Sequence, residues 1–217
     1  IVLRTIGLLE ESVPPEHILM LTFTEKAAME MRDRLTAYAS GSALSGEALD
    51  VDKVDVGTFN AWGQRIIDQY YKELGFFKMP ELIDDVVKKD IIIDILKKHP
   101  NLPFDYNNPF MSTMYHQGAV MEMLQLIDAM KAAHAASVDD VYAIVGKVSL
   151  LGGHAKELLE MYNEYNMALV SKNLLDYEDQ LRLLLELDAK GIFAKMPYEH
   201  IVIDEFQDSN PNQLDIV

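Results

Sequence analysis

Two adjacent carboxylates follow a short apolar run near the end of the sequence. Residues 201–203 are Ile, Val and Ile, and they lead directly into Asp204 and Glu205. A buried strand of this kind would hold both acids at the edge where open parallel sheets bind ligands. The first carboxylate can hold Mg²⁺, directly or through water, and the second can orient and deprotonate an attacking water. The pattern therefore predicts hydrolysis of a magnesium-bound nucleotide.

A bare apolar run followed by Asp-Glu also fits a strand that ends in a solvated acidic turn. The longer string 204–208, Asp-Glu-Phe-Gln-Asp, is more specific, because chance rarely supplies a given pentapeptide in 217 residues. We therefore favour the nucleotide-binding interpretation. Asp208 is expected to organise the loop and not to bind metal.

Three apolar runs, at 17–23, 53–59 and 200–204, are expected to be strands that position these acids. They are rich in β-branched residues, bounded by turn residues and separated by helical patterns, which is typical of a parallel sheet covered on both faces. The fold class is therefore α/β.

The middle of the sequence has a different character. Residues 78–170 show helical spacing and no convincing strand, with helices expected at 86–96, 120–133, 138–145 and 155–170. We interpret this block as an inserted all-α subdomain, and its frequent Met residues as core filling. The α/β domain would then be discontinuous, comprising 1–77 and 171–217, and Asp176 would cap the helix that leads back to the third strand.

Composition excludes several classes of protein. Hydrophobic residues make up 49% and charged residues 25%, so the chain can bury a core and is not disordered. It has no Cys, which excludes thiol chemistry and disulfides and suits a reducing cytoplasm. No apolar run approaches the ~18 residues of a membrane span. The net charge of −16 argues against a general polyanion-binding surface, so a nucleic-acid role needs a specific local signal.

Three strings supply such a signal. Residues 204–213 (Asp-Glu-Phe-Gln-Asp-Ser-Asn-Pro-Asn-Gln) resemble motif II of the UvrD/Rep family of superfamily 1A DNA helicases. Residues 21–31 (Leu-Thr-Phe-Thr-Glu-Lys-Ala-Ala-Met-Glu-Met) resemble motif Ia, and 56–61 (Val-Gly-Thr-Phe-Asn-Ala) resemble the Gly-Thr-Phe-His-Ser string of the next DNA-contacting motif. Residues 173–179 are similar to the family's Leu-Asp-Phe-Asp-Asp segment. The resemblance spans the whole chain and implies a RecA-like 1A subdomain with an inserted 1B subdomain.

The resemblance implies single-stranded DNA as a partner at two of these strings. In the first, Phe23 would stack on a base while Thr22, Thr24 and Lys26 bind phosphate. In the second, the contacts would come from Thr58, Phe59 and Asn60, although Asn and Ala stand here where the family usually has His and Ser. From the residues alone, burial of Phe23 and a simple helix cap at Thr24 are the alternatives.

The resemblance also implies ATP and Mg²⁺ in a longer parent protein. Gln207 would sense the γ-phosphate or the attacking water, beside Asp204 as metal ligand and Glu205 as catalytic base. Phosphate binding needs a Gly-rich loop ending in Gly-Lys-Ser/Thr, and no such string occurs in the sequence. We therefore expect a truncated 1A–1B fragment that is inactive alone and binds no cofactor tightly. Its remaining helicase domains would be partners, and movement from 3′ to 5′ is implied by the family.

Two alternatives remain open at this stage. A helicase–nuclease subunit of the AddA/RecB type carries similar strings, and Glu25 leans slightly toward it. A non-catalytic RecA-like module that binds DNA or protein would also accommodate the acidic charge and the missing phosphate loop, although the intact Asp204-Glu205 pair argues against such decay.

Overall fold

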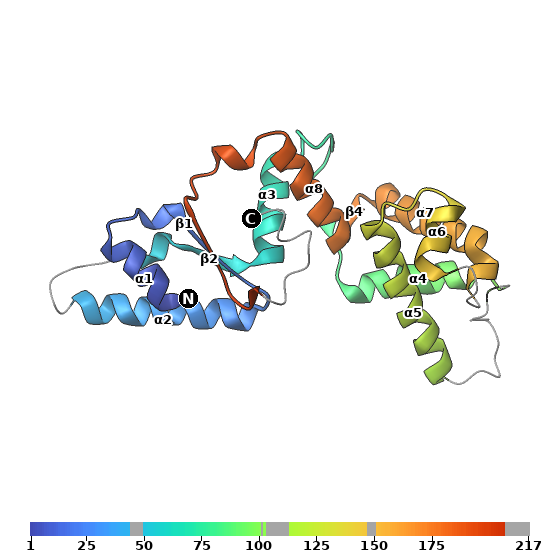
Figure 1. Ribbon diagram of the computed structural model, residues 1–217, viewed down its shortest axis with the longest axis horizontal. Helices are drawn as coiled ribbons and strands as arrows, with labels where there is room; N and C mark the ends of the chain where they lie inside the picture. The colour runs from blue at the N-terminus through green and yellow to red at the C-terminus, as the bar shows by residue number, and fades with distance from the viewer. Residues whose placement is uncertain (44–49, 101, 103–112, 147–150, 207–217) are drawn as a thin grey trace. The chain divides into compact units, whose positions relative to one another are not determined.

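The computed structural model describes residues 1–43, 50–100, 102, 113–146 and 151–206 (Figure 1). The chain divides into two compact units, Ile1–Gly75 with Gln180–Val217 and Phe76–Asp179. The return to the first unit falls at residue 180, later than the predicted 171. The reason is that Asp176 and Asp179 both bind Lys131 inside the second unit.

The first unit is built on a three-stranded parallel sheet. Its strands are β1 (Ile18–Thr22), β2 (Asp55–Thr58) and β5 (His200–Ile203), in the order β2-β1-β5. Thr22 pairs in register with Thr58, and Leu21 pairs with Ile203. The predicted α/β class with a parallel sheet is therefore confirmed, and all three strands end at one edge.

Helices cover this sheet on both faces. Helices α1 (Val2–Glu10) and α2 (Glu25–Ala43) lie on one side, whereas α3 (Phe59–Tyr70) and the first-unit part of α8 (Tyr177–Ala189) lie on the other (Figure 1). Every residue of β1 is buried, as expected for a central strand between two helical layers. The core on the side of α1 and α2 includes Ile6, Leu8, Ile18, Met20, Met31, Leu35 and Val56.

The second unit is almost entirely helical in the part of the chain that is described. Its helices are α4 (Asp85–Leu96), α5 (Thr113–Ala132), α6 (Val138–Val145) and α7 (Ala155–Lys172). One pair of two-residue parallel strands, β3 (Glu81–Leu82) and β4 (Leu174–Leu175), was too short to predict from periodicity. Met123 and Met130 are buried in the core of this unit, which confirms their interpretation as core residues, whereas Met121 is exposed and the interpretation is wrong for it.

Side-chain caps explain where several helices begin. Asp84 accepts from two backbone N–H groups at the start of α4, and Ser137 with Asp140 forms a capping box at α6. Asp176 accepts from the Asp179 N–H at 3.0 Å, as predicted for the cap of α8. Short 3-10 turns complete the described chain: η1 (Pro15–His17), η2 (Val51–Lys53), η3 (Gly152–His154) and η4 (Phe193–Lys195). None of the helices within the described ranges is long and apolar enough to cross a membrane.

Candidate functional site

The carboxyl ends of the three parallel strands bring the sequence-predicted residues to one edge of the sheet. Thr22 ends β1, Thr58 ends β2, and Asp204 follows β5 directly. The Asp204 N–H donates to the Leu21 carbonyl at 2.9 Å, which extends the β1–β5 pairing by one residue. With neighbouring strands about 4.8 Å apart, the backbone of Asp204 lies roughly 10 Å from the end of β2.

The two acids differ in their surroundings. Asp204 is half-buried, and its carboxylate has no hydrogen-bond or ion-pair partner among the described residues. Glu205 is exposed and has a positive φ of 51°, a conformation that residues other than glycine seldom adopt. Neither side chain is enclosed in the core. A backbone outlier of this kind is often found at functional positions.

The chemistry of Asp204 fits Mg²⁺. This ion binds protein through one or two carboxylates and keeps water and substrate phosphates as its other ligands. An uncommitted carboxylate at a strand end supplies one such oxygen donor. Among the described residues, no group of three or more His, Asp and Glu side chains could enclose a metal by itself. Gln207 and Asp208 lie outside the described residues.

The turn that follows β1 places its predicted contacts at different depths. Thr22 is buried and Phe23 is half-buried, whereas Thr24 and Lys26 are exposed. The Thr24 hydroxyl accepts from the Ala27 N–H at 3.2 Å, so it caps α2. Lys26 lies 4.0 Å from Glu30 one helical turn on. Thr24 and Lys26 are thus the members of this group that solvent and a ligand can reach most easily.

The turn that follows β2 is more enclosed. Phe59 is 3% exposed, and its ring packs edge-to-face on Trp62 at 5.9 Å between centroids. In this arrangement Phe59 offers no free face for stacking, because the ring is part of the core. Asn60 is partly exposed, and Thr58 is buried.

A hydrogen bond that the sequence did not reveal joins these two turns. The Thr58 hydroxyl donates to Glu25 Oε1 at 3.2 Å while it accepts from the Ala61 N–H at 3.1 Å. Thr58 therefore caps α3 and also ties it to the first residue of α2. Beside this link lies a pocket of about 200 Å³ whose lining includes Glu25, Arg32, Thr58 and Arg65. No local pattern marks the two arginines, since only the packing of α2 and α3 against β2 brings them together.

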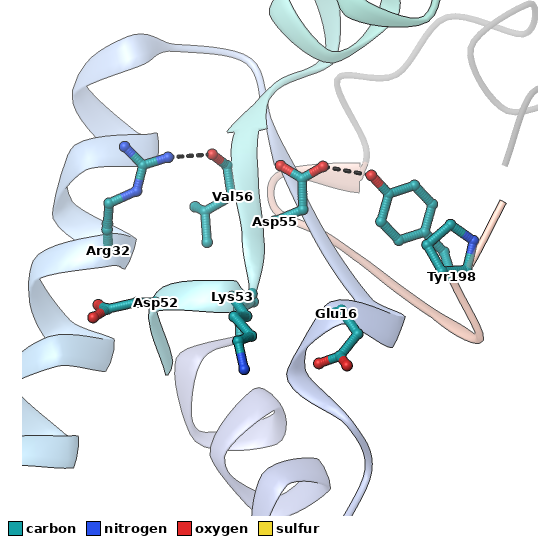
Figure 2. A pocket seen from close by; sticks show the side chains of 9 residues that line it. Glu16, Arg32, Asp52, Lys53, Asp55, Val56 and Tyr198 are labelled. Carbon is teal, nitrogen blue, oxygen red and sulfur yellow. Dashed lines mark hydrogen bonds between the residues drawn. The ribbon is translucent and has the colours of Figure 1, made fainter. Parts of the chain in front are cut away.

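A second pocket, of about 460 Å³, lies at the opposite, amino-terminal end of the strands (Figure 2). In it the Tyr198 hydroxyl donates to Asp55, which also accepts a two-pronged pair of bonds from Arg65 at 2.8 and 2.9 Å. Burial and this bond to Asp55 raise the pKa of Tyr198 to about 12. Asp55 thus links β2 and α3 to the segment that precedes β5. It lies at the amino-terminal end of the strands, opposite the end at which Asp204 lies.

The fold and the edge residues together define an α/β domain of the kind that binds nucleotides at strand ends. Residues 1–217 match the family model of the UvrD/REP helicase N-terminal domain. The chain belongs to this family.

Individual relatives align with this chain over nearly its whole length. It is 29% identical over 210 residues to the ATP-dependent DNA helicase PcrA of Leuconostoc citreum, a match that covers 95% of this chain and 25% of that protein. It is 26% identical over 218 residues to the ATP-dependent DNA helicase SRS2 of Saccharomyces cerevisiae, covering 97% of this chain and 18% of that protein. A probable DNA helicase II homolog of Mycoplasma capricolum is 26% identical over 212 residues, covering 96% and 26%. The chain thus spans about a fifth to a quarter of the length of these relatives.

Proposed function

We propose that this chain supplies the Asp-Glu half of an ATPase site and part of the single-stranded DNA contact in a longer ATP-dependent helicase that moves 3′ to 5′. The observation that carries the proposal is the common edge of β1, β2 and β5. Along this edge the Asp204 backbone pairs with Leu21, next to the first of the two turns that the resemblance assigns to DNA, and the second turn follows on the far side of β1. The family supports it, as do the relatives PcrA and SRS2, which are ATP-dependent DNA helicases.

The chemistry divides between the two acids. Bound Mg²⁺ would neutralise phosphate charge during the transfer of the γ-phosphoryl group to water. Asp204 would hold the ion, and Glu205 would orient the water and accept its proton. Gln207 stays a predicted γ-phosphate sensor. ATP, Mg²⁺ and a cytoplasmic setting are expectations for the parent, whose further domains would complete the site.

Fewer residues would contact DNA than the sequence predicted. We retain Phe23, Thr24, Lys26 and Asn60 as the reachable members of the set. The buried Thr22, Thr58 and Phe59 would shape the two turns from beneath. Such a site would bind single strands without sequence preference, because stacking and phosphate contacts do not read base edges.

The ATPase assignment is tested by Asp204→Asn and Glu205→Gln in the full-length parent. Each is expected to lower DNA-stimulated ATP hydrolysis at least ~100-fold, the lower range for removing a general base or a charge-stabilising group. Glu199→Gln is the matched control, because Glu199 precedes β5 at its other end and pairs with His17. Activity within twofold of wild type for either acid variant would refute the assignment.

The 217-residue chain itself is tested by calorimetry and fluorescence anisotropy. We expect no tight Mg·ATP binding and weak, salt-sensitive binding to an oligothymidine strand. Phe23→Ala should lower that DNA affinity at least about 5-fold, since stacking on one base contributes ~1–3 kcal/mol, or about 5- to 150-fold. An unchanged affinity would remove Phe23 from the contact, and tight ATP binding would show that the chain needs no further phosphate loop.

A further inference from the structure

We propose that Gln180 is a positioning residue for the proposed DNA contact at Asn60. The inference rests on the proposed function, because it names what holds that contact in place. Gln180 lies in the first turns of α8 and is fully buried, so it cannot touch DNA itself. Its amide instead reaches the first turn of α3, directly after Thr58.

Two hydrogen bonds make this link. Gln180 Nε2 donates to the Asn60 carbonyl at 3.2 Å and to Gln64 Oε1 at 3.3 Å. Both acceptors belong to α3, one helical turn apart. The single NH₂ group of Gln180 therefore fixes the backbone of Asn60 and the side chain of Gln64 at the same time.

The orientation of the amide is set by a relay. Gln64 Nε2 donates to Asp68 Oδ1 at 2.7 Å, which leaves Gln64 Oε1 to face Gln180 as an acceptor. A reversed Gln180 amide would place its oxygen against two acceptors. The cost of the arrangement is that Gln180 Oε1 is buried without a hydrogen-bond partner among the described residues. A buried unpaired amide oxygen is destabilising, so it offsets part of what the two donated bonds contribute to stability.

Gly63 allows the close approach that these bonds require. A Cβ atom at residue 63 would lie 2.8 Å from Leu184 Cδ1 and 3.3 Å from Gln180 Cδ. Leu184 is fully buried and has little room to move away. The absence of a side chain at 63 therefore lets α8 lie directly on α3 at the level of the Gln180 amide.

The turn at 58–60 is thus held from two sides. Glu25 binds the Thr58 hydroxyl from α2, and Gln180 binds the Asn60 carbonyl from α8. Asn60 is the partly exposed member of this turn, and its backbone is the atom group that Gln180 fixes. Loss of the Gln180 donor should let the turn shift and weaken a contact made by the Asn60 side chain.

A double-mutant cycle on the 217-residue chain tests the inference. Gln180→Met removes both donor bonds and the unpaired oxygen at similar volume, and Gln69→Met makes the same change at an exposed position of α3. Affinity for an oligothymidine strand is measured by anisotropy well below the melting midpoint of every variant. We expect Gln180→Met to weaken binding about fivefold, Gln69→Met to leave it unchanged, and Gln180→Met to have no further effect when combined with Asn60→Ala.

Equal weakening by Gln180→Met with and without Asn60→Ala would overturn the inference, since the residue would then act elsewhere. So would unchanged binding by Gln180→Met when Asn60→Ala does weaken binding. If neither single variant changes DNA binding, the proposed DNA contact at this turn fails, and the inference fails with it. If Gln180→Met does not fold, Gln180→Asn keeps a neutral amide but shortens the side chain by one methylene and withdraws the donor from Asn60, and the same loss is expected from it.

Discussion

Lys131 is the residue whose removal should destabilise the helical unit most clearly. Its Nζ atom lies 2.8 Å from Asp176 Oδ2 and 2.7 Å from Asp179 Oδ2, and 5.2 Å from the centre of the Tyr165 ring. The side chains of Lys131 and Asp176 are 6% and 1% exposed. Lys131→Met would keep the apolar volume but leave the buried Asp176 carboxylate without its cation. Breaking a buried pair in this way costs about 3–5 kcal/mol.

The pH dependence distinguishes this cause from a simple packing defect. Burial alone would raise the pKa of Asp176. The charge and hydrogen bond of Lys131, with smaller effects from the Asp179 N–H and the charge of Lys88, outweigh burial and hold that pKa below its usual value. A carboxyl group whose pKa is lower in the folded state than in the unfolded state stabilises the protein at pH values above the unfolded-state pKa, here near 3.8. This stabilisation is lost as the pH falls through the folded-state pKa. In Lys131→Met the burial effect would dominate, so the pKa of Asp176 would rise. Lowering the pH from 7 toward 5 should therefore increase the free energy of unfolding of Lys131→Met, whereas that of the wild type should not increase.

Urea unfolding monitored by circular dichroism at pH 7 and pH 5 checks both points. Lys156→Met is the control, because Lys156 lies in the same unit with its side chain 84% exposed, and such surface changes usually alter stability by under ~0.5 kcal/mol. A Lys131→Met variant within 1 kcal/mol of wild type at pH 7 would refute the reasoning. A variant that loses stability from pH 7 to pH 5 would refute the assigned cause.

Three further changes separate other contributions to stability. Gly7→Ala should stabilise α1 by about 0.5–1 kcal/mol in thermal melts, because a Cβ at Gly7 meets nothing within 4 Å. Gly63→Ala should destabilise the protein by about 1–2 kcal/mol, because its Cβ would clash with Leu184. Stability changes of the same sign in both variants would contradict the packing of α8 on α3. Tyr198→Phe should cost about 1 kcal/mol at pH 7 by removing the bond to Asp55. The pKa of Tyr198 is raised from 10.0 to about 12. The contribution of its protonated hydroxyl to folding stability is therefore complete below pH 10 and is lost as the pH rises to 12. Wild type and Tyr198→Phe should therefore converge in stability over that interval, and parallel curves would show that the hydroxyl contributes nothing.

The strands and the class of fold could be predicted because their signal is local. Runs of β-branched residues between helical patterns define buried parallel strands, and parallel strands must end at a common edge. That rule was sufficient to place Asp204 near the turns at 22 and 58. The rule could not determine how deeply each side chain at this edge is buried. Phe23 and Phe59 both follow a strand directly, yet one is half-buried and the other lies in the core against Trp62.

Contacts between distant helices could not be predicted from local pattern. Gln180 and Lys131 each look like ordinary polar positions of amphipathic helices, and their burial depends on partners 116 and 48 residues away in sequence. Gly63 likewise looks like a weak point of a helix until α8 is packed against it. The boundary between the units shifted for the same reason, because a buried ion pair, and not a change in composition, holds the segment from Asp176 to Asp179 in the helical unit.

The strongly acidic composition and the proposed DNA contact are compatible when the contact is considered locally. A net charge of −16 acts at long range, where salt screens it beyond about 10 Å. At the sheet edge, the half-buried Phe23 is followed within three residues by the exposed Lys26 in the first turn of α2. Affinity would then come from stacking and one or two phosphate contacts, so the slope of log K against log salt should be near −1. A slope several times steeper would require a broader basic surface than these turns provide.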